Sequence, residues 1–509
     1  MSGTGKTVQT LDTTGNELVD GLLSGYAWSG TITYAFPTSA SAYNYGPEKY
    51  DGFNSISQAQ INTARFAMVV GYGSAANDGF SVEGFTNARF AAGSASSATI
   101  RFAQSNEPDT AYAYMPGNYS QAGDIWFGTD YIGTVADYRK PVAGNYAWHT
   151  LLHELGHALG LKHGHEQEGA FEPLPSQYDS IEYSIMTYRG YVGGYGYAYE
   201  QYGAPQTFMM ADIAALQEMY GADFSTNSGN TVYKWTPGSG ATLVNGAVGI
   251  APGANRIFAT IWDGGGSDTY DLTAYKIALK IDLRPGKVST FSADQLAWLG
   301  GGSNDGYAAG NIFNALLYHG DTRSLIENVL GGSGNDAITG NQAANKLYGY
   351  AGNDIMNGDT GHDTLYGGVG SDKLYGSSGN DALVGDAGND ALYGGTGADR
   401  LYGGSGNDTF AFRLLAESTV GATGRDTIYD FAASDRINVS AIDANSTASG
   451  DQAFTFVGTA AFSGKNGELR YDRAASDTYI YGDVNGDKKA DFAIRLDDAV
   501  TLQKGYFLL

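Results

Sequence analysis

The stretch HELGHALGLKH, residues 153–163, holds side chains whose types and spacing suit a metal ion. The chain has seven histidines, and three of them stand here as His153, His157 and His163. Residues four apart share one face of a helix, so the first two imidazoles can reach one zinc ion. Glu154 follows the first ligand and is placed to act on a metal-bound water. The pattern predicts a zinc centre for hydrolysis.

A glycine at the expected end of the helix would allow the third histidine to reach the same ion. Gly160 stands where the helix is expected to end, and glycine readily takes the left-handed conformation of a C-cap. The chain can then turn and bring His163 to the same ion. The alternative is a helix with two exposed histidines, but the full spacing H-E-x-x-H-x-x-G-x-x-H favours the metal site. His165 is off this spacing, and we expect it to be only a neighbour.

A second motif, SIMTY at residues 184–188, follows the third histidine. A methionine turn in this place completes the metzincin signature. Met186 is expected beneath the zinc as an apolar floor and not as a ligand. Tyr188, two residues later, is a candidate for an additional zinc ligand.

Nine tandem nonapeptides run from residue 331 to 411 with the pattern G-G-x-G-x-D-x-U-x, where U is a large apolar residue. Glycines permit the tight loop that opens each unit, and the last three residues form a short strand. Two units make one turn of a parallel β-roll. The U residues then form a thin apolar core: Ile338, Leu347, Met356, Leu365, Leu374, Leu383, Leu392, Leu401 and Phe410. A disordered Gly/Asp-rich linker would not keep this apolar position.

Aspartates 18 residues apart stack on the same side of such a roll. One column is Asp336, Asp354, Asp372, Asp390 and Asp408, and the other is Asn345, Asp363, Asp381 and Asp399. Stacked carboxylates repel unless cations lie between them, and calcium takes six to eight oxygen ligands. The second unit, GNQAANKLY, lacks the inner glycine and the aspartate, so its calcium site is expected to be weak or missing.

The overall composition excludes several classes of protein. A formal charge of -25 argues against a nucleic-acid partner and an anionic membrane surface. The absence of cysteine excludes a thiol nucleophile, a cysteine zinc finger and disulfides. No apolar run reaches the roughly 18–20 residues that span a bilayer. The first residues contain no hydrophobic h-region, so no ordinary signal peptide is expected.

The chain of 509 residues is long enough for several domains. The N-terminal part has strand-like stretches such as SGTITYAFP and helical segments near 55–69, 145–160 and 207–220. The part before the repeats is β-like with frequent turns. The predicted divisions are an N-terminal segment 1–18, a domain 19–225 with the zinc motifs, a β-rich connecting part 226–330, the β-roll 331–411 and a β-sandwich-like cap 412–509.

The two zinc motifs followed by glycine–aspartate nonapeptides resemble the serralysin family, which are secreted bacterial zinc endopeptidases with an RTX calcium-binding domain. GYAWSGTITYAFP (25–37), AYAYMPG (111–117) and IENVLGGSGND (326–336) are also similar to family segments. The resemblance implies an α+β metzincin catalytic domain followed by an all-β domain with a calcium-binding parallel β-roll. It also implies hydrolysis of peptide bonds in proteins with broad specificity by a zinc metalloprotease domain at 19–225. A possible propeptide remnant in 1–18 and a secretion signal in 412–509 are implied as well.

The resemblance assigns roles to single residues. Zinc would be bound by His153, His157 and His163, with Glu154 as general base, and Tyr188 would bind zinc at rest and then swing away to stabilise the oxyanion. Peptide substrate would pair along the sheet edge formed by Ala111, Tyr112, Ala113 and Tyr114. The implied calcium ligands are Asp263, Gly265, Gly266, Asp268, Glu327, Gly332, Gly334, Asp336, Gly349, Asp354, Gly358, Gly361, Asp363, Gly367, Gly368, Gly370, Asp372, Gly376, Gly379, Asp381, Gly385, Gly388, Asp390, Gly394, Gly395, Gly397, Asp399, Gly403, Gly404, Gly406 and Asp408.

The resemblance also implies partners and a location. The family leaves the cell unfolded through a type I exporter and folds outside, where calcium is plentiful. Protein and peptide substrates and a small protein inhibitor are the implied partners. Neither nucleic acid nor membrane insertion is expected, and the chain is expected to be an extracellular monomer with one catalytic Zn²⁺ and several structural Ca²⁺.

Other interpretations of the same features remain open. RTX repeats also occur in calcium-dependent adhesins and surface-layer proteins, in which a catalytic part could be vestigial. An RTX lipase would need a G-x-S-x-G elbow after a strand, and the similar stretches here belong to the repeats. The loop DVNGDKKAD, with Asp483, Asn485, Asp487 and Asp491, opens like an EF-hand but has Ile494 where the bidentate glutamate is required.

Overall fold

The computed structural model describes residues 6–73 and 79–509, which fall into two compact units. The first comprises the chain up to residue 268 together with 285–326, and the second comprises 269–284 and 327–509. The predicted connecting part 226–330 is thus divided between them, while the domain boundaries given above stay predictions. Residues 1–5 of the predicted N-terminal segment lie outside the described residues.

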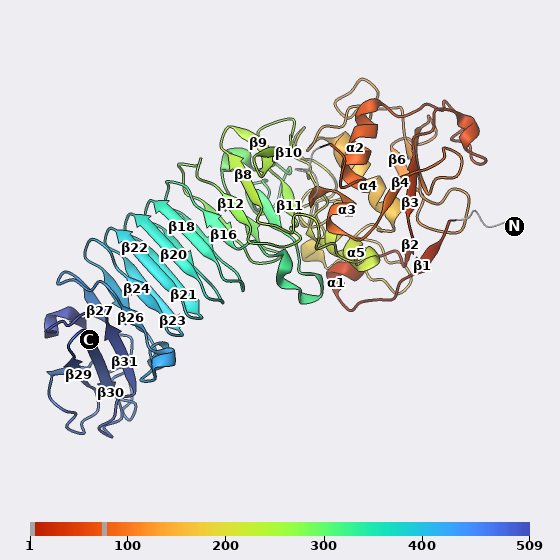
Figure 1. Ribbon diagram of the computed structural model, residues 1–509. Coiled ribbons are helices and arrows are strands. Elements are labelled where there is room, and N and C mark those ends of the chain that lie inside the picture. Colours follow the sequence, from red (N-terminus) through yellow and green to blue (C-terminus); the bar gives the residue numbers. More distant parts are fainter. Residues whose placement is uncertain (1–5, 74–78) are drawn as a thin grey trace. The chain divides into compact units, whose positions relative to one another are not determined.

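A five-stranded sheet forms the framework of the first unit (Figure 1). The strand order is β4-β3-β5-β7-β6, and β6 alone runs antiparallel to its neighbour. The strands are β3 Ile32–Ala35, β4 Phe90–Ala92, β5 Ile100–Gln104, β6 Ala111–Ala113 and β7 Asp124–Phe127. The position of β6 at the end of this order leaves one of its edges without a strand in the described part of the chain.

Three longer helices accompany the sheet, as the sequence predicted. They are α2 Gln58–Met68, α4 Tyr146–Leu159 and α5 Met210–Tyr220. Asn145 caps α4 by accepting the backbone N–H of Trp148, which satisfies one of the orphan donors at a helix start. Helix α4 packs against α2, β6 and β7. The shorter helices are α1 Glu17–Asp20 and α3 Val82–Phe85.

The remaining strands of the first unit lie outside this five-stranded sheet. β1 pairs with β2, β8 and β10 both pair with β9, and β15 joins β11 to β14. Their bounds are β1 Val8–Thr10, β2 Tyr26–Trp28, β8 Val232–Thr236, β9 Ser239–Val244, β10 Ala247–Ile250, β11 Ala259–Ile261, β14 Val288–Ser289 and β15 Ile312–Asn314.

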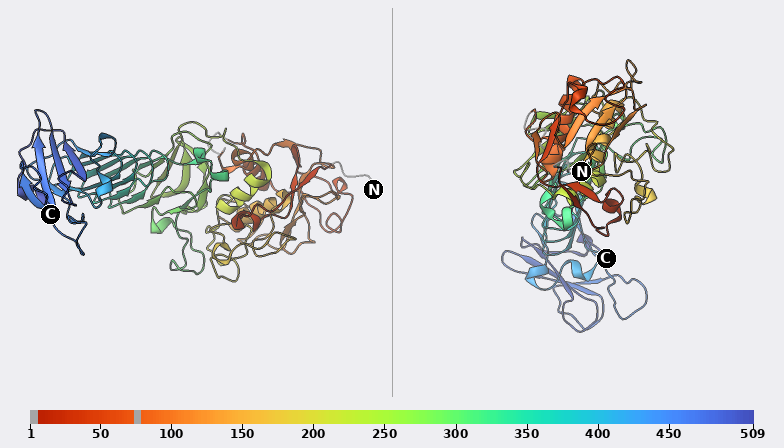
Figure 2. Two further views of the ribbon diagram at one scale, coloured as in Figure 1. Left: turned by 90° about the horizontal axis from the view of Figure 1, so that it is seen from below. Right: turned by 90° about the vertical axis from the view of Figure 1, so that its right-hand side faces the viewer.

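The second unit is built on the parallel β-roll predicted from the repeats. Each strand pairs in parallel with the strand 18 residues later, for example Leu347 with Leu365 and Leu365 with Leu383. The strands lie side by side in both Figures 1 and 2. All nine U residues are at most 1% exposed, which confirms the predicted core. The strands of the repeats are β17 Ala337–Thr339, β18 Lys346–Ala351, β19 Ile355–Asn357, β20 Thr364–Val369, β21 Lys373–Ser378, β22 Ala382–Ala387, β23 Ala391–Thr396, β24 Arg400–Tyr402 and β25 Thr409–Ala411.

The roll extends beyond the repeats at both ends. Before them, β12 Thr269–Asp271 pairs with β16 Asn328–Leu330, and β13 Lys280–Asp282 pairs with β17. After them, the ladders continue into β26, β27, β31 and β32, and β28 to β30 complete the C-terminal part. Those strands are β26 Thr427–Ile428, β27 Arg436–Asn438, β28 Thr455–Gly458, β29 Glu468–Arg473, β30 Thr478–Asp483, β31 Phe492–Leu496 and β32 Phe507–Leu508. No helix of the described residues has the length and apolarity to cross a bilayer.

Candidate metal centre

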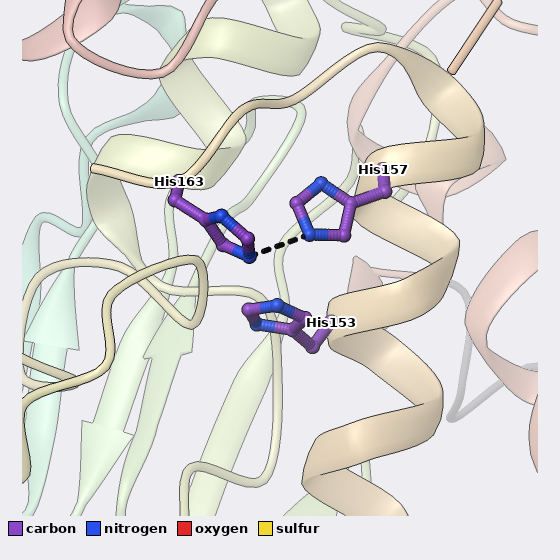
Figure 3. Close-up of side chains that lie close together, drawn as sticks. All are labelled: His153, His157 and His163. Atoms are coloured by element: carbon purple, nitrogen blue, oxygen red, sulfur yellow. Dashed lines mark hydrogen bonds between the residues drawn. The ribbon is translucent and has the colours of Figure 1, made fainter. Parts of the chain in front are cut away.

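The three histidines of the sequence motif meet in space. One ring nitrogen from each of His153, His157 and His163 lies within 4.8 Å of the other two. Figure 3 shows the three rings converging, two from helix α4 and one from the chain beyond it. Gly160, with φ +118°, ends the helix in the left-handed conformation, which confirms the predicted C-cap. That turn is what carries the third ring back towards the first two.

Partners of the Nδ1 atoms leave the Nε2 atoms of the helical histidines available to an ion. His153 Nδ1 lies 2.7 Å from the carbonyl oxygen of Ile185, and His157 Nδ1 lies 2.8 Å from that of Leu161. A carbonyl oxygen only accepts, so each Nδ1 carries the proton and each Nε2 keeps its lone pair. His163 Nδ1 lies 3.0 Å from a carboxylate oxygen of Glu166, within ion-pair distance but without the geometry of a hydrogen bond, and the sequence reasoning missed this neighbour. Outer partners such as the two carbonyl oxygens orient metal-binding imidazoles.

The electrostatics of the cluster suit zinc. Burial, reinforced by neighbouring imidazoles, lowers the pKa of His157 to about 3 and holds that of His153 well below its ordinary value. The rings are therefore neutral at pH 7, which is the form that binds metals. The Nε2 atoms of His157 and His163 are 2.9 Å apart. Two nitrogens bound tetrahedrally to one zinc would be about 3.3 Å apart, so the donor set fits the ion after a small adjustment.

Met186 lies against the metal-site helix, as the sequence predicted for an apolar floor. Its side chain is fully buried, and a Cβ atom added at Gly156 would lie 2.6 Å from its sulfur. The inner glycine of HELGH therefore leaves room for the methionine turn.

An aspartate that the sequence reasoning missed holds this turn. Asp212 on α5 accepts the hydroxyl of Ser184 at 2.5 Å and the backbone N–H of Ile185 at 2.9 Å. Burial raises the pKa of Asp212 to about 7. Because the carbonyl of Ile185 accepts from His153, the carboxylate of Asp212 supports a metal-site residue through the turn. The N-terminal position of Asp212 in a predicted helix was its only sequence signal.

Glu154 is placed as a base beside the cluster. Its side chain is 5% exposed, its Oε2 atom has no hydrogen-bond partner among the described residues, and burial raises the pKa of the carboxyl group to about 8. A buried carboxylate oxygen without a donor is costly unless water or an ion completes it. This orphaned atom fits the position of a water on a bound metal.

Tyr188 lies over the histidines but is 45% exposed. Its ring centroid is 4.3 Å from that of His163 and 5.8 Å from that of His153. Burial, with the charge of Glu154, raises its pKa to about 12, so the phenol stays protonated at neutral pH. The structure brings this residue to the cluster, while its role as a ligand stays a prediction. His165 is a neighbour whose ring centroid lies 5.5 Å from that of His163.

Two cavities flank the cluster, and both are lined by Glu154 and Tyr188. One has a volume of about 230 Å³ and is lined by tyrosines, the buried His149 and Thr150. The other, of about 210 Å³, includes the strand Ala111–Ala113 with His157 and His163. Space for a chain therefore exists on both sides of the metal centre, and β6 borders it. Tyr114, predicted with this strand, lies one residue past its end.

The aspartates of the two columns are buried, and in most of them only one of the two carboxylate oxygens accepts a hydrogen bond. In each column, Oδ1 accepts the backbone N–H of the residue 18 positions earlier, as between Asp354 and Asp372 at 2.8 Å. The Oδ2 atoms of the following aspartates have no hydrogen-bond partner in the described chain: Asp354, Asp363, Asp372, Asp381, Asp390, Asp399 and Asp408. Burial raises their pKa values, to about 7 for Asp363 and about 6 for Asp381. Rows of buried carboxylate oxygens without donors fit a hard cation such as calcium.

Two members of the columns differ from this pattern. Both oxygens of Asp336 accept backbone N–H groups, from Leu279 and Gly332. Asn345, in the second repeat, donates its amide to the carbonyl oxygen of Glu327 at 3.1 Å. A neutral amide thus stands where the neighbouring turns have a carboxylate, and the weak calcium site expected there stays a prediction.

The roll continues both columns past the last repeat, which the sequence reasoning missed. Asp399 donates its N–H to Asp426, and Asp408 donates to Asp435, each after an interval of 27 residues. The segment after the last repeat hides this periodicity. The signal that could have revealed it is the aspartate-x-apolar pattern in Asp426–Ile428 and Asp435–Ile437.

The acidic loops outside the repeats have other hydrogen-bond partners than the aspartate columns. Asp263 and Asp268 are both buried, and burial together with the charge of Asp268 raises the pKa of Asp263 to about 9. Tyr233 donates its hydroxyl to Asp263 at 2.8 Å. In the loop that resembles an EF-hand, Asp483 instead accepts backbone N–H groups of its own loop from Asn485, Gly486 and Lys488.

Comparison with known proteins agrees with these features. The family described as Peptidase M10 serralysin C terminal matches residues 222–506. Serralysin G from Dickeya chrysanthemi is 30% identical over 334 residues, covering 63% of this chain and 61% of the relative. Metalloprotease AprA from Pseudomonas entomophila (strain L48) is 30% identical over 368 residues, covering 67% and 66%. The chain thus spans less than two thirds of the length of either relative.

Solved structures also match part of this chain. The solution structure of the AlgE6R3 subunit of the Azotobacter vinelandii mannuronan C5-epimerase covers 35% of this chain and 80% of its own, with 24% identity. Its TM-score of 0.19 is too low to carry an argument.

Proposed function

The chain belongs to the serralysin family of M10 peptidases, and on that premise we propose that it is a secreted zinc endopeptidase that hydrolyses peptide bonds in proteins with broad specificity. The observation that carries the proposal is the meeting of three neutral imidazoles beside Glu154, a buried carboxylate with one unpartnered oxygen. The functions of an adhesin or a lipase do not require three metal-binding imidazoles beside a buried carboxylate. His153, His157 and His163 would hold the zinc ion.

The proposed reaction divides the work among a few groups. A bound zinc ion supplies a Lewis acid and lowers the pKa of water towards about 7. Glu154 takes a proton from the attacking water and later gives it to the leaving amine nitrogen. Tyr188 donates its phenolic proton in a hydrogen bond to the developing oxyanion. The exposed position of Tyr188 leaves its side chain room to move between a resting and a working position.

The open edge of β6 supports broad specificity. A peptide that adds to a sheet edge is held by main-chain hydrogen bonds, which do not distinguish side chains. β6 borders the cavity that also contains Glu154 and two of the histidines, so a peptide on this edge would pass the metal centre.

We propose that the buried aspartates and the glycine loops of the roll bind calcium, and that this binding stabilises the enzyme outside the cell. Glycine is required in these loops because a Cβ atom at Gly370 would overlap the carbonyl oxygen of Gly352 one turn below. Export by a type I system, control by a small inhibitor and a monomeric state complete the proposal by analogy with the family.

The decisive test compares the chain with Glu154→Gln and Glu154→Ala. Hydrolysis of casein and zinc per chain are measured on the same preparations, with Glu168→Gln as a control at a nearby exposed carboxylate. We expect one zinc in each protein and a loss of activity of about 10²–10⁴-fold in the Glu154 variants alone. Unchanged activity in Glu154→Gln would refute the assignment of the general base, and absence of zinc from the unaltered chain would refute the metal centre.

A further inference from the structure

Two tyrosines of the β6 region share a single buried carboxylate. Glu48 is 1% exposed, and its Oε1 atom accepts the hydroxyl of Tyr112 at 2.6 Å and that of Tyr114 at 2.7 Å. Burial and the hydrogen bond to Glu48 raise the pKa of Tyr114 to about 12 and hold that of Tyr112 above its ordinary value, so both phenols remain donors.

The local backbone is built to admit this carboxylate. Gly46 has φ +73°, and a Cβ atom there would overlap Oε2 of Glu48. Glycine thus serves both the left-handed turn and the space for the side chain. The segment is also tied to the core, because the ring of Tyr43 packs on Trp126 of β7 with centroids 4.6 Å apart. The segment that carries Glu48 is therefore anchored to the core of the first unit through Tyr43.

The hydrogen-bond pattern of β6 shows which groups face its open edge. Tyr114 N–H donates to the carbonyl oxygen of Asp124 at 3.0 Å, and Gly128 N–H donates to that of Thr110 at 2.5 Å. Bonding alternates along an antiparallel pair, so the N–H and C=O groups of Ala111 and Ala113 point to the open edge. These are the groups that an added peptide strand would meet.

The strand is short, and apart from its pairing it is held by packing against α4 and against the aromatic cluster of Tyr43 and Trp126. β6 has three residues and pairs with β7 only. Side chains alternate across a strand, so Tyr112 and Tyr114 lie on the face opposite Ala111 and Ala113. The carboxylate thus fixes the strand through the two residues whose backbone groups bond to β7, while the alanine backbone groups stay open. A peptide pairing with so short a strand needs it to be held in one position.

We propose that Glu48 is a positioning residue that fixes β6 in the register an extended peptide substrate requires. This inference rests on the proposed function, and it narrows the substrate to chains long enough to pair with both Ala111 and Ala113. Glu48 contacts neither the substrate nor the metal centre; it acts through Tyr112 and Tyr114.

Kinetics on the full zinc- and calcium-loaded enzyme test the proposal. Glu48→Gln, Tyr112→Phe and Tyr114→Phe are compared on a ten-residue quenched-fluorescence peptide and on a peptide too short to pair with the edge. We expect KM for the long peptide to rise about tenfold in Glu48→Gln with kcat within about twofold, and the short peptide to show no change in KM. Glu83→Gln is the control, because Glu83 is a similarly buried carboxylate that accepts from Val70 and Phe90.

Amide hydrogen exchange provides a readout that does not depend on activity. We expect the amides of Tyr112 and Tyr114 to exchange at least tenfold faster in Glu48→Gln and to be unaffected in Glu83→Gln. If neither exchange nor the long-peptide KM changes, or if Glu83→Gln changes them equally, Glu48 has no positioning role. If the unaltered chain cleaves no peptide while amide exchange responds as expected, the proposed peptidase function is refuted. The role of Glu48 in holding β6 is then still supported.

Discussion

Gly156 and Met186 touch at a point where no side chain larger than glycine fits: a Cβ atom at Gly156 would lie 2.6 Å from the methionine sulfur. The contact joins helix α4, which carries two of the metal-site histidines, to the turn whose Ile185 carbonyl orients His153. Packing and coordination are therefore coupled at this place.

Gly156→Ala should displace the methionine turn from the helix. Overpacking of a filled core typically costs about 1–3 kcal/mol, and the shift would move the acceptor of His153. We expect a lower unfolding temperature and weaker zinc binding, measured by calorimetry and by competition with a chromogenic chelator. An unaltered zinc affinity would show that the contact is only packing.

Asp212→Asn should lower the affinity for zinc, although Asp212 acts on the metal site only through the turn that holds Ile185. An amide at this position has one acceptor oxygen in place of two, so it cannot accept from Ser184 and from the N–H groups of Ile185 and Met209 at once. Leaving such groups unsatisfied costs about 1–3 kcal/mol, and loss of an outer partner lowers metal affinity about 10–100-fold. Asp223→Asn, at a buried aspartate that bonds Ser225 and Thr226, should keep full zinc affinity. Equal zinc affinities in the two variants would contradict the role of Asp212.

Tyr188→Phe should slow the reaction without unfolding the protein. Loss of one donor to an oxyanion typically lowers kcat about 10²-fold. Burial raises the pKa of the Tyr188 phenol to about 12, so in the zinc-free protein this group stays protonated up to about pH 10. Tyr195→Phe, at a fully exposed ring, is the control. A kcat equal to wild type would remove Tyr188 from the mechanism.

Without calcium, the free energy of unfolding of the roll should decrease as pH rises from about 4 to 7. Burial raises the pKa of Asp354, Asp363 and Asp390 to about 7 from the ordinary 3.8. Without calcium the folded roll binds more protons than the unfolded chain, so stability is greatest below about pH 4 and falls as pH rises to 7. With calcium, which binds the ionised carboxylates, stability should instead fall on acidification below about pH 7.

Circular dichroism melts in excess EGTA and in millimolar calcium, between pH 4 and 8, measure this reversal. The calcium-depleted roll should be unfolded or strongly destabilised at pH 8. Melts that coincide in the two buffers at every pH would rule out calcium as the stabilising ion.

Asp381→Asn should change the stability in opposite directions with and without calcium. The amide oxygen can still accept the N–H of Asp363, but the buried negative charge is gone. We expect a higher unfolding temperature in EGTA, where the charge is uncompensated, and a lower one in calcium, where a ligand is weakened. Asp386→Asn in the same roll is the control, because Asp386 is exposed. A shift of one sign in both buffers would argue against a calcium ligand at Asp381.

Short spacings and repeats in the sequence predicted the metal site and the β-roll of this protein. The spacing of His153, His157 and His163 identified the metal site because helix geometry and one glycine stop fix where three nearby rings can go. The nonapeptide repeat gave the β-roll, its apolar column and its stacked aspartates, because each turn repeats the contacts of the one before it.

Only the tertiary structure decided which distant groups support these motifs. Asp212 holds the methionine turn from another helix, Glu48 binds two tyrosines more than 60 residues away, and Asp426 and Asp435 extend the aspartate columns after a break in the repeat. Each of these carboxylates acts through a contact set by packing between separate elements. Such contacts leave no periodic trace in the sequence, because the chain between the partners is free to vary in length.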